Sequence, residues 1–370
     1  MVRELRDTQL IIDLNKIKKN IEVVKDIIGP DVAFMPVIKA NGYGHGAVGI
    51  APAIMETKPA YLAVATLSEA VELKEAYPDY PVFIMGHTPN KYLPYVIEYN
   101  IAITVFSLAQ VEELGHLAAE AGKTATVHVK VDTGFHRLGC MPSEAYADEV
   151  CRMFEVNHVE VEGIFSHLAL ANDEENDKQY NMFCDFIEEI ERRGYFFKYK
   201  HIADSIATVD YPKYHMNMVR PGAIIYGMRR NAEATVPVDP ALSFVTAISQ
   251  LHEIKAGEGV SYDYLWKAER DSVVATLPFG YADGYPRNLR DKGYVIINGT
   301  KCPIVGVICM DQCIADVTDV PDVAEGMKAL IYGDGTDGAM TIAEAAALAG
   351  SNKNEIIARF LARPQRIYIG

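Results

Sequence analysis

A lysine at the end of a short apolar run is the residue best placed to do chemistry in this sequence. Residues 33–38 have the length of a buried strand, Lys39 follows them, and Gly42, Gly44 and Gly46 shape the turn behind it. Partial burial disfavours the ammonium form and lowers its pKa, so such a lysine can form a Schiff base or accept a proton near neutral pH. The alternative is an exposed strand-end lysine before an ordinary turn.

Other polar residues follow further strand candidates. Because the carboxyl ends of parallel barrel strands meet at one face, side chains placed there are candidates for a common site. Each also has an ordinary explanation: a turn at residues 132–134, a satisfied core histidine, or a surface arginine before Pro221. The candidates are Arg137, His167, Ser205 and Arg220.

Strand and helix patterns alternate through the first two thirds of the chain. Eight or nine such units predict an N-terminal (β/α)8 TIM-like barrel. An open doubly wound sheet is the alternative, weakened because no Gly-x-Gly-x-x-Gly follows the first strand. The predicted helices include Leu14–Ile28, Ser68–Ala76, Leu108–Ala121 and Asn181–Arg193. The predicted strands are Thr8–Asp13, Val32–Lys39, Tyr61–Ala65, Pro81–Met85, Ile101–Phe106, Thr124–Val131, Val159–His167, Tyr199–Ala203 and Met216–Val219.

After about residue 235 the pattern changes to short β segments separated by Gly, Pro and Asp turns. We therefore expect a barrel domain at 1–235 and a mostly-β C-terminal domain at 236–370, joined by a linker at Ala234–Pro240. The first strand, near residues 8–13, is a candidate to pack with the second domain. The expected segments are Ala241–Ile254, Ser272–Leu277, Tyr294–Ile297, Cys302–Ile308, Ile314–Val317 and Lys328–Tyr332, with helices at Thr341–Ala349 and Asn354–Leu361.

Composition excludes several classes of function. The chain has 370 residues, 49% hydrophobic and 23% charged, which is ordinary for a globular protein. A net charge of −15 argues against nucleic-acid binding through a broad basic face. No apolar run reaches the length of a membrane span, and residues 1–7 do not resemble a signal peptide. The six cysteines lack metal-ligand spacing, so we expect free thiols, no metal site and a cytoplasmic location.

Six strings of residues resemble, in order and over nearly the whole chain, the alanine racemase family of fold-type III pyridoxal-phosphate enzymes. They lie at 37–46, 131–139, 219–227, 259–262, 280–287 and 309–312. The resemblance implies a barrel plus a C-terminal β domain, the cofactor pyridoxal 5′-phosphate, and a homodimer whose active site is shared across the interface. It also implies interconversion of L- and D-alanine, which supplies D-amino acid for peptidoglycan.

The same resemblance implies a two-base mechanism. Lys39 serves the D-enantiomer, and Tyr262 of the partner subunit serves the L-enantiomer. A tyrosine with a pKa of about 10 is a poor base at neutral pH, so it needs support, which the family draws from His167 and Arg220. Arg220 also faces the pyridine nitrogen. Because a guanidinium only donates, it weakens the cofactor as an electron sink, which we expect to limit transamination.

The resemblance further implies two sets of binding residues. Lys130 matches a position that is carbamylated in some family members. The cofactor set is Lys39, Tyr43, Arg137, His167, Ser205, Arg220, Gly222, Ala223 and Asn354. The substrate set is Arg137, Tyr262, Tyr281, Met310, Asp311 and Asn354.

One position departs from the family pattern. Asn354 stands where alanine racemases usually have a tyrosine, and asparagine is smaller and both donates and accepts hydrogen bonds. It would leave room for a serine hydroxyl, as in the serine-racemising branch linked to vancomycin resistance, although the N-terminal membrane domain usual in that branch is absent from this chain.

Two further functions remain open. One is an amino-acid decarboxylase on the same architecture, which generally has a carboxylate where Arg220 stands. The second is a non-catalytic cofactor carrier of the single-barrel type, which lacks the second domain.

Overall fold

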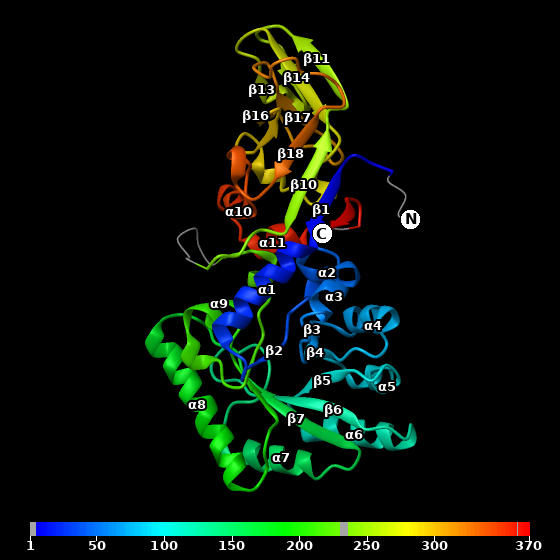
Figure 1. Ribbon diagram of the computed structural model, residues 1–370, viewed down its shortest axis with the longest axis vertical. Coiled ribbons are helices and arrows are strands. Elements are labelled where there is room, and N and C mark those ends of the chain that lie inside the picture. The colour runs from blue at the N-terminus through cyan, green and yellow to red at the C-terminus, as the bar shows by residue number, and fades with distance from the viewer. Residues whose placement is uncertain (1–4, 230–235, 361) are drawn as a thin grey trace. The chain divides into compact units, whose positions relative to one another are not determined.

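The computed structural model describes residues 5–229, 236–360 and 362–370. Its contacts divide the chain into two compact units (Figure 1). The barrel unit comprises Asn20–Gly42 and Ala51–Ile225. The β unit comprises Met1–Lys19, Tyr43–Ile50 and Tyr226–Gly370. The domain boundary expected at residue 235 and the start of the expected linker fall in 230–235, outside the described residues, so that boundary stays a prediction.

Parallel strands form a closed ring in the barrel unit. The eight-stranded sheet runs in the order β2-β9-β8-β7-β6-β5-β4-β3. Hydrogen bonds from Ala60 N to Phe34 O and from Ile38 N to Ala63 O, 2.9 and 2.8 Å, join its two ends. This closure confirms the predicted barrel and excludes the open doubly wound sheet. The strands are β2 Ala33–Phe34, β3 Leu62–Val64, β4 Val82–His87, β5 Ala102–Val105, β6 Ala125–Lys130, β7 Val159–Phe165, β8 Tyr199–His201 and β9 Met218–Val219.

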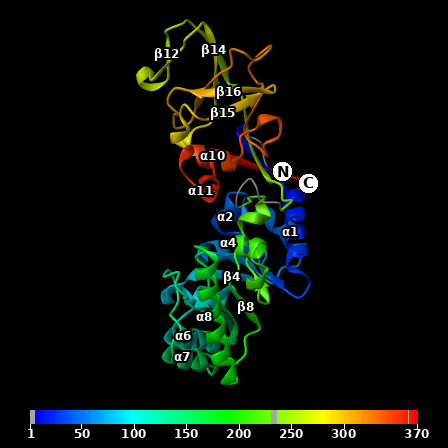
Figure 2. The ribbon, with the colours of Figure 1, turned by 90° about the vertical axis from the view of Figure 1, so that its left-hand side faces the viewer.

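Helices cover the outside of this ring (Figures 1 and 2). The longest, α8 (Asp173–Arg192), begins eight residues before the predicted Asn181. Its first two turns are polar and lack apolar periodicity, but Asn172 caps it and three acidic residues in the first turn favour the helix dipole. The remaining helices are α1 Leu14–Ile28, α3 Ala47–Met55, α4 Leu67–Ala76, α5 Leu93–Glu98, α6 Leu108–Glu120, α7 Glu144–Phe154 and α9 Ser205–Asp210, while α2 Lys39–Tyr43 is a left-handed turn.

Polar side chains sit inside the otherwise apolar barrel. His128 and His201 are fully buried, and their Nδ1 and Nε2 atoms lie 2.9 Å apart. Glu162 accepts hydrogen bonds from Tyr61 at 2.5 Å and from Lys198 at 2.7 Å. Burial favours the protonated carboxyl, but hydrogen bonds from His128, Lys198 and Tyr61 prevail and lower the pKa of Glu162 to about 2. The barrel core therefore holds a buried carboxylate that its neighbours satisfy.

A nine-stranded sheet forms the β unit, in the order β11-β14-β17-β16-β15-β18-β10-β1-β19. β1 (Gln9–Asp13) pairs antiparallel with β10 and parallel with β19, which unites both ends of the chain. The segment predicted at 241–254 is two strands, β10 Leu242–Ala247 and β11 Gln250–Ile254. The sheet's other strands are β14 Ser272–Leu277, β15 Tyr294–Ile297, β16 Thr300–Val305, β17 Cys313–Asp316, β18 Lys328–Tyr332 and β19 Gln365–Ile369. β12 (Gly259–Val260) and β13 (Trp266–Lys267) pair with each other in a separate two-stranded sheet.

Two helices complete the β unit, α10 Ile342–Ala349 and α11 Lys353–Ala358. The last residue of the second predicted helix, Leu361, lies outside the described residues. Across the described part of the chain, no helix combines the length and apolar character that crossing a membrane requires.

Candidate active site

Lys39 lies in the barrel unit just beyond the bridge that Val37 makes to Ala63. The chain then turns through left-handed conformations, with φ of 52° at Ala40 and 53° at Asn41. Left-handed backbone costs a residue other than glycine about 1–2 kcal/mol. Such strain persists only where the surroundings hold it.

The Glu69 carboxylate stabilises the left-handed turn after Lys39. Its Oε1 accepts the Ala40 amide at 2.6 Å, while Oε2 accepts the amides of Ala65 and Thr66 at 2.8 and 3.2 Å. Thr66 and Glu69 also form a capping box at the start of α4. One carboxylate therefore fixes the turn after Lys39 to the loop after β3.

The surroundings of Lys39 are strongly cationic. Burial lowers the pKa of Lys39, and the charges of Arg137 and Arg220 lower it further, against opposing contributions from Glu69 and Asp204. This is the direction required of a lysine that accepts a proton near neutral pH.

Arg220 is buried and held by two carbonyls. It donates to Ser166 O at 2.7 Å and to Ile202 O at 2.9 Å, and its guanidinium lies 5.2 Å from the Phe165 ring centre. Its buried Nε has no acceptor among the described residues. Burial lowers the pKa of Arg220 to about 10, so it stays charged at neutral pH. It thus presents an unused donor to any acceptor that enters the site.

His167 and Lys130 respond to the same positive charge. Burial and the neighbouring Arg220 and Arg137 lower the pKa of His167 to about 2, so its imidazole is neutral. Burial and Arg220 lower the pKa of Lys130 to about 7, and its Nζ donates to Val131 O at 2.5 Å. The cluster suits an anionic ligand that offers acceptors.

Two segments of the barrel unit meet at Ser205. Its Oγ accepts the Gly222 amide at 2.7 Å and the Ile224 amide at 3.4 Å. The preceding Asp204 caps α9 by accepting the amides of Ile206 and Ala207, both at 3.0 Å. Because its Oγ accepts these amides, Ser205 has its hydroxyl hydrogen left as the group that suits a phosphate acceptor.

In the β unit, the segment that follows Lys39 packs tightly. The Tyr43 and Tyr226 ring centres lie 5.2 Å apart, and His45 stacks on Tyr226 at 4.5 Å. Gly44 has φ of 78°, and a Cβ there would clash with Ile357 O in α11. Only glycine fits this approach.

Tyr262 stands on a strained turn of the β unit. Ser261 before it has φ 63° and ψ −169°, a region used almost only by glycine, and Asp263 after it has φ 59°. The Ser261 hydroxyl holds the turn by donating to Val307 O at 2.8 Å. The Tyr262 side chain is 66% exposed within its own chain.

Three further substrate candidates of the β unit, Tyr281, Met310 and Asp311, lie on two neighbouring loops. Tyr281 N donates to Cys309 O at 3.2 Å and Ala282 N to Met310 O at 3.0 Å, so the loops at 280–283 and 309–311 are held together. Tyr281 and Met310 are about half exposed. Asn354, the second residue of α11, is also exposed.

The structure gathers the candidates by unit. On the barrel unit, Lys39, Lys130, Arg137, His167 and Arg220 lie within electrostatic reach of one another, and Ser205 meets Gly222. On the β unit lie Tyr43, Tyr262, Tyr281, Met310, Asp311 and Asn354. Sequence reasoning assigned no role to Glu69 or to Ser261. The Thr66-x-x-Glu69 capping box could have revealed the first, whereas the string at 259–262 contains Ser261 but carries no sign of its contact with Val307.

A closed parallel barrel with a lysine among cations, followed by a mostly-β unit, defines a two-domain barrel protein with a cluster of cations around one lysine. The chain belongs to the alanine racemase family. The family model described as "Alanine racemase, N-terminal domain" matches residues 12–230, and the "C-terminal domain" model matches 241–368.

Alanine racemases of several bacteria are similar to this chain over nearly its whole length. An alanine racemase of Clostridium tetani is 36% identical over 377 residues, covering 100% of this chain and 97% of that protein. The solved alanine racemase of Clostridium difficile 630 has a TM-score of 0.95 at 30% identity, covering 99% of this chain and 97% of its own. The enzyme from Bartonella henselae, solved with covalently bound pyridoxal phosphate, has a TM-score of 0.87 at 28% identity, covering 99% and 100%.

Proposed function

We propose that this protein is a pyridoxal-phosphate-dependent racemase that interconverts L- and D-alanine. One observation carries the proposal: in a chain of the alanine racemase family, Lys39 is partly buried beside two arginines, and both its burial and their charges lower its pKa. By its family the protein would act in the cytoplasm and supply D-alanine for peptidoglycan.

The barrel unit fits the cofactor. Lys39 would attach it covalently, which the covalently bound pyridoxal phosphate of the Bartonella henselae relative supports. The buried, unpaired Nε of Arg220 would donate to the ring nitrogen, and Ser205 with the Gly222 and Ala223 amides would face the phosphate. Tyr43 would be a further phosphate ligand. When bound, pyridoxal phosphate draws electrons from the substrate Cα and acidifies its hydrogen.

The chain's own residues then move the proton. Lys39 takes or returns it on one face of Cα, and Tyr262 of the partner subunit does so on the other. The 66% exposure of the Tyr262 side chain in its own chain supports a role across a homodimer interface. The pKa of His167, near 2, keeps its imidazole neutral, so His167 would support the tyrosine by hydrogen bonding rather than by charge.

Substrate recognition would fall to both units. The Arg137 guanidinium suits the substrate carboxylate. The Met310 amide, Asp311 and Tyr281 share the joined loops at 280–283 and 309–311. These residues would orient Cα between the two bases.

Serine is the second candidate substrate, and Asn354 is the observation that favours it. Its side chain is exposed at the start of α11, and its amide would pair with a serine hydroxyl. A decarboxylase is less favoured because the buried Arg220 stands where such enzymes generally have a carboxylate. A non-catalytic single-barrel cofactor carrier is less favoured because this chain has a second, mostly-β unit.

Racemisation of L-alanine and L-serine, followed by chiral chromatography, tests both candidates. We expect both D-products, and we expect Asn354→Tyr to lower the serine-to-alanine ratio of kcat/KM about tenfold, through loss of one hydrogen bond and of space. Asn352→Asp keeps the α11 cap and serves as the control. If the cofactor-loaded protein racemises neither amino acid, the assignment as an alanine or serine racemase is wrong. If Asn354→Tyr leaves the serine-to-alanine ratio of kcat/KM unchanged, Asn354 does not determine the choice of substrate.

Glu69→Gln should change both the rate and its pH dependence. The substitution removes a charge that raises the pKa of Lys39 and one of the acceptors that hold the strained turn. We expect racemisation to fall about three- to tenfold, with its acid limb shifted to lower pH because Lys39 then loses its proton more readily. The pH profile of kcat/KM measures this.

Glu72→Gln is the matched control, because Glu72 is an exposed carboxylate on the same helix. It should leave the profile unchanged. An acid limb that stays in place in Glu69→Gln would contradict the electrostatic link between Glu69 and Lys39.

A further inference from the structure

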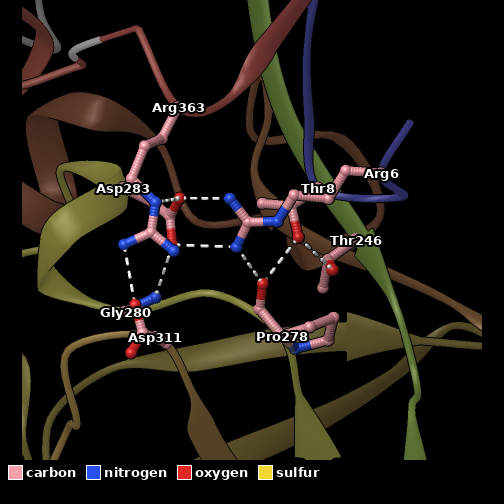
Figure 3. A network of polar contacts seen from close by, with 8 residues as sticks. All are labelled: Arg6, Thr8, Thr246, Pro278, Gly280, Asp283, Asp311 and Arg363. Carbon is pink, nitrogen blue, oxygen red and sulfur yellow. Dashed lines mark hydrogen bonds and ion pairs between the residues drawn. The ribbon is translucent and has the colours of Figure 1, made fainter. Parts of the chain in front are cut away.

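Asp283 is a fully buried carboxylate in the β unit, with 0% side-chain exposure. A buried charge persists only where it is paired and hydrogen-bonded. The charge partner of Asp283 is Arg6, 277 residues earlier in the chain. Arg6 NH1 lies 2.5 Å from Oδ1 and NH2 lies 3.0 Å from Oδ2, which is the two-pronged geometry of a guanidinium fork (Figure 3).

The segment that carries Arg6 is anchored at more than one point. Arg6 NH2 also donates to Pro278 O, directly after β14. The Thr8 hydroxyl donates to the same carbonyl at 2.8 Å and meets the Thr246 hydroxyl at 2.9 Å. The residues before β1 are thus tied to the start of the loop that leads to Asp283 (Figure 3).

Asp283 in turn shapes that loop. Its Oδ2 accepts the Gly280 amide at 3.0 Å and closes the turn at 280–283. This turn holds the 309–311 loop through the hydrogen bonds from Tyr281 N to Cys309 O and from Ala282 N to Met310 O. A Cβ on Gly280 would clash with the carbonyls of Cys309 and Met310, so the two loops are in close backbone contact.

A second arginine continues the chain of charges. Arg363, from the C-terminal segment, lies 3.5 Å from Asp283 Oδ1 and donates to Asp311 Oδ1 at 2.7 Å. Charges therefore alternate from Arg6 through Asp283 and Arg363 to Asp311, as Figure 3 shows. The Arg6–Asp283 pair is the buried part of this chain of charges, and it resists displacement because moving Arg6 leaves the Asp283 charge unpaired. Arg363 and Asp311 are 41% and 61% exposed, so their pair contributes less.

We propose that Arg6 is a positioning residue for the substrate end of the active site. Arg6 neutralises Asp283, Asp283 holds the 280–283 turn, and that turn sets the Met310 amide and, with Arg363, the Asp311 carboxylate. That these loops bind substrate rests on the proposed function, whereas the contacts that join Arg6 to them do not. Arg6 itself touches neither substrate nor cofactor.

Hydrogen exchange and kinetics on the cofactor-loaded, full-length protein test the proposal. In Arg6→Gln we expect amide exchange to rise at least about fivefold in peptides covering 278–284 and 307–313. KM for alanine should rise about tenfold, with kcat changed less than about threefold, because binding in ground and transition states is lost together. Arg6→Lys should restore part of both effects, since lysine keeps the charge but not the fork.

Two further variants separate positioning from stability. Arg270→Gln is the matched control, because Arg270 and Asp319 form a 2.5 Å pair whose side chains are 57% and 72% exposed. It should change neither exchange nor KM. Arg363→Gln removes the hydrogen bond to Asp311 and the longer contact with Asp283, which Arg6 still pairs, so exchange should rise mainly at 307–313 and much less at 278–284.

The outcomes are distinct. If Arg6→Gln lowers the melting temperature but leaves exchange at 307–313 and KM equal to those of Arg270→Gln, Arg6 only stabilises the fold and the proposal is wrong. If Arg6→Gln does not fold, Arg6→Lys and Arg363→Gln decide by the same readouts. A wild-type protein that racemises no amino acid would reject the proposed function, while the exchange data would still decide whether Arg6 positions the loops.

Discussion

Replacing Tyr262 with phenylalanine is expected to slow racemisation of alanine by about 10²–10⁴-fold, the contribution of one positioned acid–base group. The change removes only the phenol oxygen. The strained turn stays in place because the Ser261 hydroxyl still donates to Val307 O. Cofactor absorbance should therefore be unchanged. Deuterium uptake at Cα, followed by NMR in heavy water, should continue for D-alanine through Lys39 and nearly stop for L-alanine.

Tyr264→Phe provides a control from the same turn. Tyr264 is 65% exposed, much like Tyr262, and its backbone is left-handed, with φ 44°, as is that of Ser261 and Asp263 in the same turn. Deuterium uptake by both enantiomers should match that of the wild type. Equal losses for L- and D-alanine in Tyr262→Phe, or no loss at all, would show that Lys39 and Tyr262 do not divide the two faces of Cα.

The barrel could be predicted because buried parallel strands leave a strong local pattern. Each is an apolar run between turn residues, so β3 and β5 to β9 fall inside their expected segments, and β4 runs two residues past its expected end at Met85. Pairing between distant segments leaves no such pattern. β19 was not expected, since its register comes from β1, more than 350 residues earlier in the chain. The start of α8 was missed because a capping asparagine and first-turn acids replace apolar periodicity.

The candidate site divides in the same way. Lys39, His167 and Arg220 could be found because their residue types stand at strand ends within strings that resemble one family. Glu69 acts on backbone amides, and Ser261 acts on a carbonyl 46 residues away. Neither contact has a side-chain partner that a sequence pattern could record. Arg6 and Asp283 are 277 residues apart, so only the folded sheet brings them together.

Lys39→Ala should have the largest effect of all, because it removes a base and the covalent attachment point of the cofactor together. We expect racemisation to fall by at least about 10³-fold and deuterium uptake by D-alanine to stop. Cofactor absorbance should lose the signature of a lysine adduct. Added methylamine, which fits the space of the missing side chain, should restore part of the activity.

Lys74→Met is the control that separates the position of a lysine from its pKa. Burial lowers the pKa of Lys74 as it does that of Lys39, but Lys74 lies in α4 and donates to the Pro78 and Tyr80 carbonyls. Its loss should lower the melting temperature, because two carbonyls lose their donor, and leave the rate per folded molecule unchanged, because Lys74 is not among the charges that act on Lys39. If Lys39→Ala retains racemisation, or if Lys74→Met lowers the rate per folded molecule as much as Lys39→Ala does, then the cation cluster around Lys39 is not the catalytic centre.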